Sequence, residues 1–365
     1  MEEREKEYLY WLCQVPGLGA VTIDRLYDYC GSFQDIYNIE EKSLVDNKFL
    51  NERQAECFQM MKGKRDHYKK EYHSLEKMGI RFLTPWDSEY PKRLMHIYGK
   101  PMGIYVKGKL PETERPSIAV IGARNCTSYG EQEAEYFGKI LSRHGIQIVS
   151  GLARGIDGAA QWGAVKEGRD TYAVLGCGIN ICYPKENYAL YEEILKSGGI
   201  ISEFRLGEEP KSANFPMRNR IISGLSDAVL VIEAKEKSGS LITVDYGLEQ
   251  GKEIFALPGR AADALSAGCN QLIKNGANLV TNPSDLIEYF GLKQEKILRL
   301  HEKNVNGLAK KEKMVYSCLD LQPKFLEQIV KACGLPPSEC MSILIGLELG
   351  GFILQTTSNY YVKKI

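Results

Sequence analysis

Residues 117–130 read SIAVIGARNCTSYG, and residues 146–158 read IQIVSGLARGIDG. In each stretch a short apolar run is followed by glycine, a basic residue and a segment of helix length. Comparable apolar runs recur further along the chain, at Thr171–Leu175, Gly199–Ser202, Ala228–Glu233 and Glu253–Leu257. Short buried runs that alternate with helices are typical of a parallel, doubly wound sheet. The sequence therefore predicts an α/β, Rossmann-like domain over residues 115–291.

The N-terminal part of the chain has a different pattern. At 365 residues the chain exceeds the roughly 250–300 residues that a single core usually serves, so more than one domain is expected. Residues 1–75 are helical in pattern, like a SAM or helix-hairpin-helix domain, with a glycine turn at residues 15–20 (VPGLGA). Such a hairpin can present N–H groups to a phosphate, but a structural αα-turn is the favoured interpretation. Residues 76–114 are expected to form a connector with short strands, such as residues 103–106 (GIYV), that leads into the sheet.

The C-terminal part predicts a winged helix. Residues 292–309 are polar and are interpreted as a linker, and residues 310–365 contain three helical patterns followed by two strands. The third helix usually reads duplex DNA in this fold. Here its segment Ser338–Leu344 carries no Lys or Arg, so a protein contact or an autoregulatory role is as strongly indicated as DNA binding.

Composition narrows the class of partner. The 47 Lys and Arg balance the 47 Asp and Glu, so a nucleic-acid site must be a local basic patch. The ten cysteines form no CxxC pair and have few histidines nearby, which predicts buried thiols in a reducing cytosol and no metal site. A start without a signal peptide, and no long apolar run, predict a cytoplasmic protein that does not enter a membrane.

The loops that follow the predicted strands carry the candidate site. Gly122, Arg124 and Gly151 follow the first two strands, where glycine permits close backbone approach and a helix N-terminus offers free N–H donors to an anion. This arrangement is not G-x-G-x-x-G, and no acidic residue closes the second strand, so no dinucleotide cofactor is expected. Asp157 stands near a helix start, and we expect it to make a local contact there.

Later loops add cations and aromatic rings. We expect Pro216 to start a helix whose first turn carries Arg218, Asn219 and Arg220. Cations there oppose the helix dipole, which favours a bound anion over solvated arginines. Lysine or arginine with aromatic rings suits single-stranded nucleic acid. The predicted DNA-binding residues are Gly122, Arg124, Gly151, Lys185, Asn187, Tyr188, Phe215, Arg218, Asn219, Arg220, Gly239, Ser240 and Thr243.

No catalytic residue is assigned. The five histidines lie outside these loops, and no nucleophile–base pair or carboxylate dyad is apparent. Glu203 and Glu233 end strands and are the only candidate bases if the protein is an enzyme.

The central domain resembles the DNA-processing protein A (DprA/Smf) family. The resemblance is carried by residues 215–226 (FPMRNRIISGLS), 238–243 (SGSLIT), 255–259 (FALPG) and 268–277 (GCNQLIKNGA), and by Gly122–Arg124, Ser150–Asp157 and Tyr183–Asn187. It implies a homodimeric protein of natural transformation that binds and protects incoming single-stranded DNA and helps load the RecA recombinase. The family's DNA-contacting arginine and lysine correspond to Arg124 and Lys185.

Two alternatives remain. Lysine-decarboxylase-like (LOG) nucleotide hydrolases share a Rossmann-like core but use a Pro-Gly-Gly-x-Gly-Thr-x-x-Glu motif. The corresponding residues 238–245 (SGSLITVD) have neither the Gly-Gly pair nor the glutamate. A nucleotide-sensing regulator attached to a winged helix would bind a mononucleotide saturably.

Overall fold

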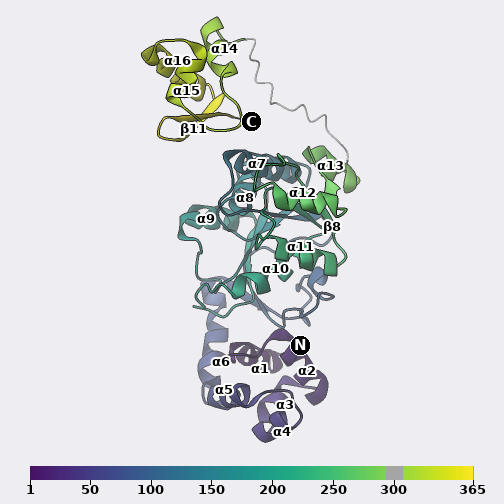
Figure 1. The fold of residues 1–365 in the computed structure, drawn as a ribbon. Coiled ribbons are helices and arrows are strands. Elements are labelled where there is room, and N and C mark those ends of the chain that lie inside the picture. The colour runs from purple at the N-terminus through teal and green to yellow at the C-terminus, as the bar shows by residue number, and fades with distance from the viewer. Residues whose placement is uncertain (293–306, 365) are drawn as a thin grey trace.

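The computed structural model describes residues 1–292 and 307–364, in which a large central sheet adjoins an N-terminal helical bundle (Figure 1). The bundle is built from a buried aromatic and aliphatic core around Trp11, whose indole N–H donates to the carbonyl of Met61 at 2.8 Å. Its helices are α1 (Glu3–Gln14), α2 (Ala20–Cys30), α3 (Phe33–Asn38), α4 (Glu41–Asp46), α5 (Glu52–Lys62) and α6 (Arg65–Ser74).

The central sheet has nine strands in the order β1-β2-β6-β5-β4-β3-β7-β8-β9. Seven of these strands are parallel; six of them lie at the predicted apolar runs, and β9 was not predicted. They are β3 (Ser117–Ile121), β4 (Gln147–Ser150), β5 (Thr171–Leu175), β6 (Gly199–Ser202), β7 (Ala228–Val231), β8 (Glu253–Ala256) and β9 (Asn278–Leu279).

The predicted connector over residues 76–114 is in fact part of this sheet. β1 (Ile80–Leu83) and β2 (Ile104–Gly108) form an antiparallel pair, and β2 adds antiparallel to β6. The prediction missed this because prolines and the 3-10 turns η1 (Glu76–Met78) and η2 (Lys92–Leu94) interrupt the pattern. The buried side chains of Phe82 and Tyr105 join these strands to the N-terminal bundle through Tyr10.

Helices cover both faces of the sheet. Successive residues of β3 point to opposite faces: Ile118 and Val120 pack with α7 (Ser128–Arg143), α8 (Ile156–Lys166) and α13 (Pro283–Tyr289). Ala119 and Ile121 pack instead with α10 (Asn214–Gly224), α11 (Leu241–Glu249) and α12 (Ala267–Lys274). A further helix, α9 (Tyr188–Ser197), packs on β5 and β6. The Rossmann-like, doubly wound fold is therefore confirmed.

The direction of winding changes at β3. From β3 the chain proceeds outward to β4, β5 and β6, and then returns to place β7, β8 and β9 on the other side of β3. In open α/β sheets, ligands bind in the crevice at the carboxyl ends of the strands where the order reverses. The junction of β3 and β7 is the switch point of this sheet.

The C-terminal unit is a winged helix, as predicted. Its helices are α14 (Lys310–Ser317), α15 (Leu326–Cys333) and α16 (Pro337–Leu349), and its sheet has the order β10-β12-β11, with β10 at Lys324–Phe325, β11 at Ile353–Thr357 and β12 at Tyr360–Lys363. The second helix was expected to begin at Lys324 but begins at Leu326, because Lys324 and Phe325 pair with β12. Within residues 1–292 and 307–364, no helix is both long and apolar enough to cross a membrane.

Candidate nucleic-acid interface

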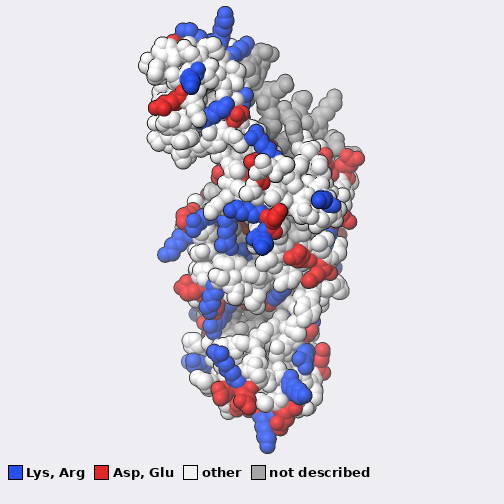
Figure 2. Space-filling view, in the orientation of Figure 1, with Lys and Arg blue, Asp and Glu red and all other residues white. Residues whose placement is uncertain are grey.

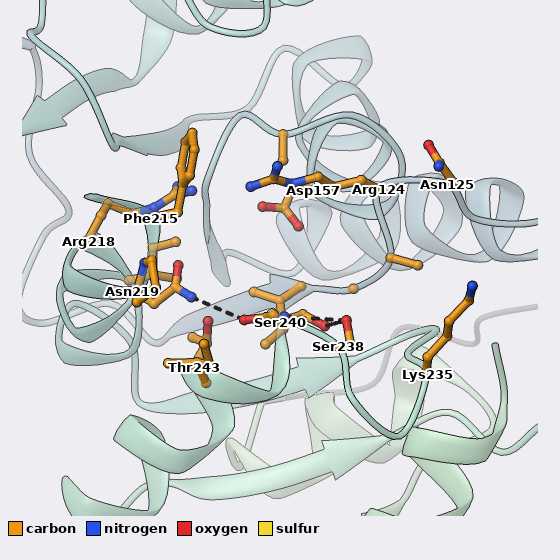
Figure 3. A pocket seen from close by; sticks show the side chains of 18 of the residues that line it. Arg124, Asn125, Asp157, Phe215, Arg218, Asn219, Lys235, Ser238, Ser240 and Thr243 are labelled. Atoms are coloured by element: carbon orange, nitrogen blue, oxygen red, sulfur yellow. Dashed lines mark hydrogen bonds between the residues drawn. The ribbon is translucent and has the colours of Figure 1, made fainter. Parts of the chain in front are cut away.

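A cavity of about 610 Å³ opens at the switch point, between the loops that follow β3 and β7 (Figure 3). Its wall includes the N-terminal half of α10 and the first turn of α11. The lining residues that bear on its chemistry are Gly122, Arg124, Asn125, Asp157, Phe215, Arg218, Asn219, Lys235, Lys237, Ser238, Gly239, Ser240 and Thr243. A smaller hollow of about 210 Å³ shares Arg124, Phe215 and Arg218 and adds Gly151, Arg154 and Tyr183.

An aromatic ring stands between the two hollows. Phe215 lies beneath the Arg124 guanidinium, whose central carbon is 4.7 Å from the ring centroid, and beside Tyr183 at 5.7 Å between centroids. Gly176 makes room for this ring, since a Cβ at that position would fall 2.7 Å from it. Arg124 and Tyr183 are exposed. The arrangement offers a charge and a stacking face on one surface, which is how proteins hold a single strand.

Arg218 is a buried cation beside the cavity. Its side chain is only 4% exposed, its guanidinium donates to the carbonyl of Val174, and its Nε has no partner within the described residues. Burial lowers the pKa of Arg218 to about 10, and Asp157 offsets part of that effect. Gly151 permits the close approach, because a Cβ there would lie 2.0 Å from Nη1. Arg218 thus supplies positive charge at the junction of the two hollows.

Asp157 makes the local contact that was predicted for it. Its carboxylate accepts from the backbone N–H of Gly151 at 3.1 Å. Burial raises the pKa of Asp157 above its ordinary value, while Arg218 and Arg124 act in the opposite direction.

The loop after β4 is held in a strained conformation. Leu152 is buried and has a φ of 55°, in the region that favours glycine. Its N–H donates to Gln161 at 3.1 Å, and its carbonyl accepts from the Asn187 amide at 2.9 Å. Such strain costs on the order of 1–3 kcal/mol and persists where surrounding contacts determine it. The amide of Asn187 therefore serves this loop, which brings Gly151 and Arg154 to the smaller hollow.

Of the predicted residues, four lie outside both hollows: Lys185, Asn187, Tyr188 and Arg220. Lys185 is exposed in the 3-10 turn η3 (Lys185–Asn187), next to Pro184. Tyr188 is 58% exposed, and its ring lies nearly parallel to that of Tyr191, with 6.4 Å between centroids.

The expected position of the arginine motif is wrong. α10 begins at Asn214, before Pro216, so Arg218 lies in the second turn of the helix. Arg220 is not brought to the cavity: its side chain is 9% exposed and forms an ion pair with Glu203. The charge of Arg220 is therefore balanced by Glu203 and not by a bound anion at the helix N-terminus. Arg218 and Asn219 do line the cavity.

Both candidate bases are already engaged. Glu203 is the partner of Arg220, and burial raises its pKa. The carboxylate of Glu233 accepts from the N–H of Thr127 at 2.8 Å and from its hydroxyl at 2.6 Å, which holds the start of α7. The described residues contain no group of three or more His, Cys, Asp or Glu side chains arranged to hold a metal ion.

The sequence analysis missed several residues of the site. Lys235 and Lys237 line the cavity. They lie between two motifs, Glu233-Ala234 and Ser238–Thr243, and were not part of either motif, so they were not predicted. Asn125, Arg154 and Tyr183 were likewise not selected. Only their position could have indicated a role in the site, since each lies in a loop at the carboxyl edge of the sheet. Figure 2 shows Lys and Arg side chains gathered over the middle of the central domain, whereas the helical bundle carries both signs interspersed.

Comparison with known proteins places the chain in a family. A model of the DNA recombination-mediator protein A family matches residues 81–291, and a model of the DprA winged helix domain matches residues 302–358. Protein Smf of Synechocystis is 31% identical over 98% of this chain and 99% of its own length. DNA processing protein DprA of Streptococcus pneumoniae is 41% identical over 61% of this chain and 77% of its own length.

Solved structures agree with these matches. The X-ray structure of DNA processing protein A from Streptococcus pneumoniae has a TM-score of 0.67 at 34% identity, covering 79% of this chain and 99% of that one. The Helicobacter pylori DNA processing protein A, described for its single-stranded DNA binding mode, has a TM-score of 0.52 at 30% identity, covering 57% and 95%. The chain belongs to the DNA recombination-mediator protein A family, the DprA/Smf proteins.

Proposed function

We propose that this protein binds single-stranded DNA in the cavity at the switch point of its sheet. The observation that carries the proposal is the arrangement of Arg124 over Phe215, with the buried cation Arg218 behind them. A phosphate contacts the guanidinium, while an unpaired base stacks on the aromatic surface that the half-buried Phe215 and the exposed Tyr183 offer. The relative from Helicobacter pylori, described for single-stranded DNA binding, supports the proposal.

The wider role that we propose follows from the family. Its description as a recombination mediator, and the DNA-processing relatives, support a role in natural transformation, in which the protein protects incoming strands and helps load RecA onto them. We further propose that it acts as a homodimer in the cytoplasm and has no catalytic activity. Measuring RecA assembly on strands coated by this protein tests the RecA-loading role. Analytical sedimentation tests the homodimer.

The nucleotide-hydrolase alternative is weakened by the geometry. Glu203 is bound to Arg220 and Glu233 to Thr127, so neither carboxylate is free to activate water. A screen for release of base or phosphate from nucleotides remains the direct test of catalysis.

Binding of a fluorescent oligonucleotide, single-stranded against duplex, tests the main proposal. The wild type is compared with Arg124→Glu/Lys185→Glu over a range of salt concentrations. We expect a salt-sensitive preference for the single strand that the double variant loses. The matched control is Lys42→Glu/Lys77→Glu, which reverses two exposed lysines outside the site. Equal loss in both variants, or no binding by the wild type, would refute the assignment.

A further inference from the structure

The loop that carries Arg124 is fixed at both of its ends by one residue. Glu233 lies just beyond β7 and is only 6% exposed. Its backbone carbonyl accepts from the N–H of Ala123 at 2.7 Å. Its carboxylate accepts from the N–H of Thr127 at 2.8 Å and from the Thr127 hydroxyl at 2.6 Å. Residues 124–126 therefore lie between two points that are both held by Glu233.

Glycines allow the loop to pack this closely against Glu233. A Cβ at Gly122 would fall 2.8 Å from the carbonyl oxygen of Glu233, and a Cβ at Gly130 would fall 2.4 Å from its carboxylate carbon. On the other side of the loop, a Cβ at Gly155 would fall 2.3 Å from the carbonyl oxygen of Ala123. The loop and Glu233 are therefore packed as one unit.

The hydroxyl of Thr127 connects this unit to α7. It donates to Glu233 and accepts from the N–H of Gly130 at 3.0 Å, which caps the first turn of the helix. Glu233 itself lines neither the larger cavity nor the smaller hollow, whereas Arg124 lines both. The carboxylate thus reaches the site through Thr127 and the loop, and not by touching a ligand.

The sign of the charge on Glu233 separates a positioning role from a purely electrostatic one. A negative charge beside a site for phosphate repels the ligand, and a buried charge is screened by salt less than an exposed one. If Glu233 contributed only its charge, removing that charge would strengthen the binding of an anion. If Glu233 holds the loop in place, removing the charge weakens binding instead.

From these contacts we infer that Glu233 is a positioning residue of the single-strand site. It holds the loop so that the Arg124 guanidinium stays over the ring of Phe215, at 4.7 Å from the ring centroid, where it meets a phosphate. The inference rests on the proposed function and adds to it a residue that acts through Thr127 without contacting the strand.

Glu233→Gln tests the inference, because it keeps the shape of the side chain but places an NH₂ group where one carboxylate oxygen accepts a hydrogen bond. Fluorescence anisotropy with an oligothymidylate measures the affinity over a range of salt concentrations. Loss of one phosphate contact lowers the salt slope by about 0.7, which corresponds to a loss of affinity of up to about fivefold at 0.1 M salt. The matched control is Glu167→Gln, which removes ion pairs to Lys139 and Arg143 near the opposite end of α7 and leaves both quantities unchanged.

A double-mutant cycle with Thr127 provides the second readout. Thr127→Val removes the hydroxyl that Glu233 holds, whereas Thr127→Ser retains it and is expected to bind as the wild type does. We expect the losses from Glu233→Gln and Thr127→Val to be non-additive, because both substitutions break the same connection. Urea unfolding of each variant measures any general loss of stability, which leaves the salt slope of the folded protein unchanged. Thr127→Val provides the same test if Glu233→Gln fails to fold.

Failure of the inference and failure of the proposed function are distinguishable. If Arg124→Glu abolishes single-strand binding while Glu233→Gln binds as well as the wild type or more tightly, only the positioning role is refuted. Additive losses in the cycle also overturn it. If the wild type itself does not bind, the proposed function is refuted as well.

Discussion

A methyl group at Gly151 provides a sharp test of how the site is assembled. In Gly151→Ala, the added Cβ falls 2.0 Å from Nη1 of Arg218 and 2.7 Å from Cζ and Nη2, whereas ordinary contact begins near 3.4 Å. Arg218 cannot simply move into solvent, because its side chain is 4% exposed and its guanidinium donates to the carbonyl of Val174. The substitution therefore forces a buried cation away from the strand edge that holds it.

Two effects follow, with different magnitudes. Overpacking of this kind typically costs ~1–3 kcal/mol, so the free energy of unfolding of the central domain falls by that amount. Weakening a charged hydrogen bond adds to the loss, since such bonds contribute ~1.5–3 kcal/mol. Displacing Arg218 from the cavity wall lowers single-strand affinity by about tenfold or more, where tenfold corresponds to ~1.4 kcal/mol. Urea unfolding measures the first effect, and fluorescence anisotropy with an oligothymidylate measures the second.

The control is Gly346→Ala in α16, where a Cβ meets nothing within 4 Å. It is expected to leave DNA affinity unchanged. In an Arg218→Met background the cost of Gly151→Ala should largely disappear, because the two positions are in contact. Normal stability and normal affinity for Gly151→Ala alone would refute the placement of Arg218 against this glycine.

Three further predictions concern separate features. Phe215→Leu keeps an apolar side chain but removes the stacking face under Arg124, so single-strand affinity should fall by about tenfold while urea unfolding changes little; unchanged affinity would argue against stacking. Arg220→Met leaves Glu203 buried without its partner and should cost ~3–5 kcal/mol in urea unfolding; a loss of DNA affinity without that cost would instead make Arg220 a contact residue. Burial raises the pKa of Cys177 from an ordinary 9.0 to about 12, so the native thiol should resist iodoacetamide at pH 8. Its contribution to the free energy of unfolding should be lost as the pH rises from 9 to 12. Rapid labelling of the native protein would contradict this.

The sheet could be predicted from the sequence because its strands are buried on both faces. Runs such as Ser117–Ile121 and Thr171–Leu175 are continuous and apolar, and the structure places strands at these residues. A short strand was expected at residues 103–106, where β2 lies, but the place of β1 and β2 in the sheet was missed because they are short, antiparallel and separated by proline-rich turns. Their place in the sheet depends on pairing with β6, which is a long-range contact.

The site could be predicted in outline, since the carboxyl ends of parallel strands must meet at one edge. The sequence could not predict which side chains enter the cavity. Arg218 and Arg220 are two residues apart on one helix, yet one lines the cavity and the other turns to Glu203. Helix geometry separates them by about 200° around the axis, and the packing of α10 on the sheet through Ile221 and Ile222 decides which one faces the cavity. The sequence also did not indicate that the amide nitrogen of Asn187, a predicted DNA contact, hydrogen-bonds the carbonyl of the strained residue Leu152.

Photocrosslinking tests the central claim most directly. An oligonucleotide carrying 5-iodouracil, which crosslinks to aromatic rings that stack on it, is irradiated with the wild-type protein, and the modified peptides are identified by mass spectrometry. We predict crosslinks at Phe215 and Tyr183 that disappear in Arg124→Glu. Crosslinks confined to the N-terminal bundle or the winged helix, with none at the switch point of the sheet, would contradict the account.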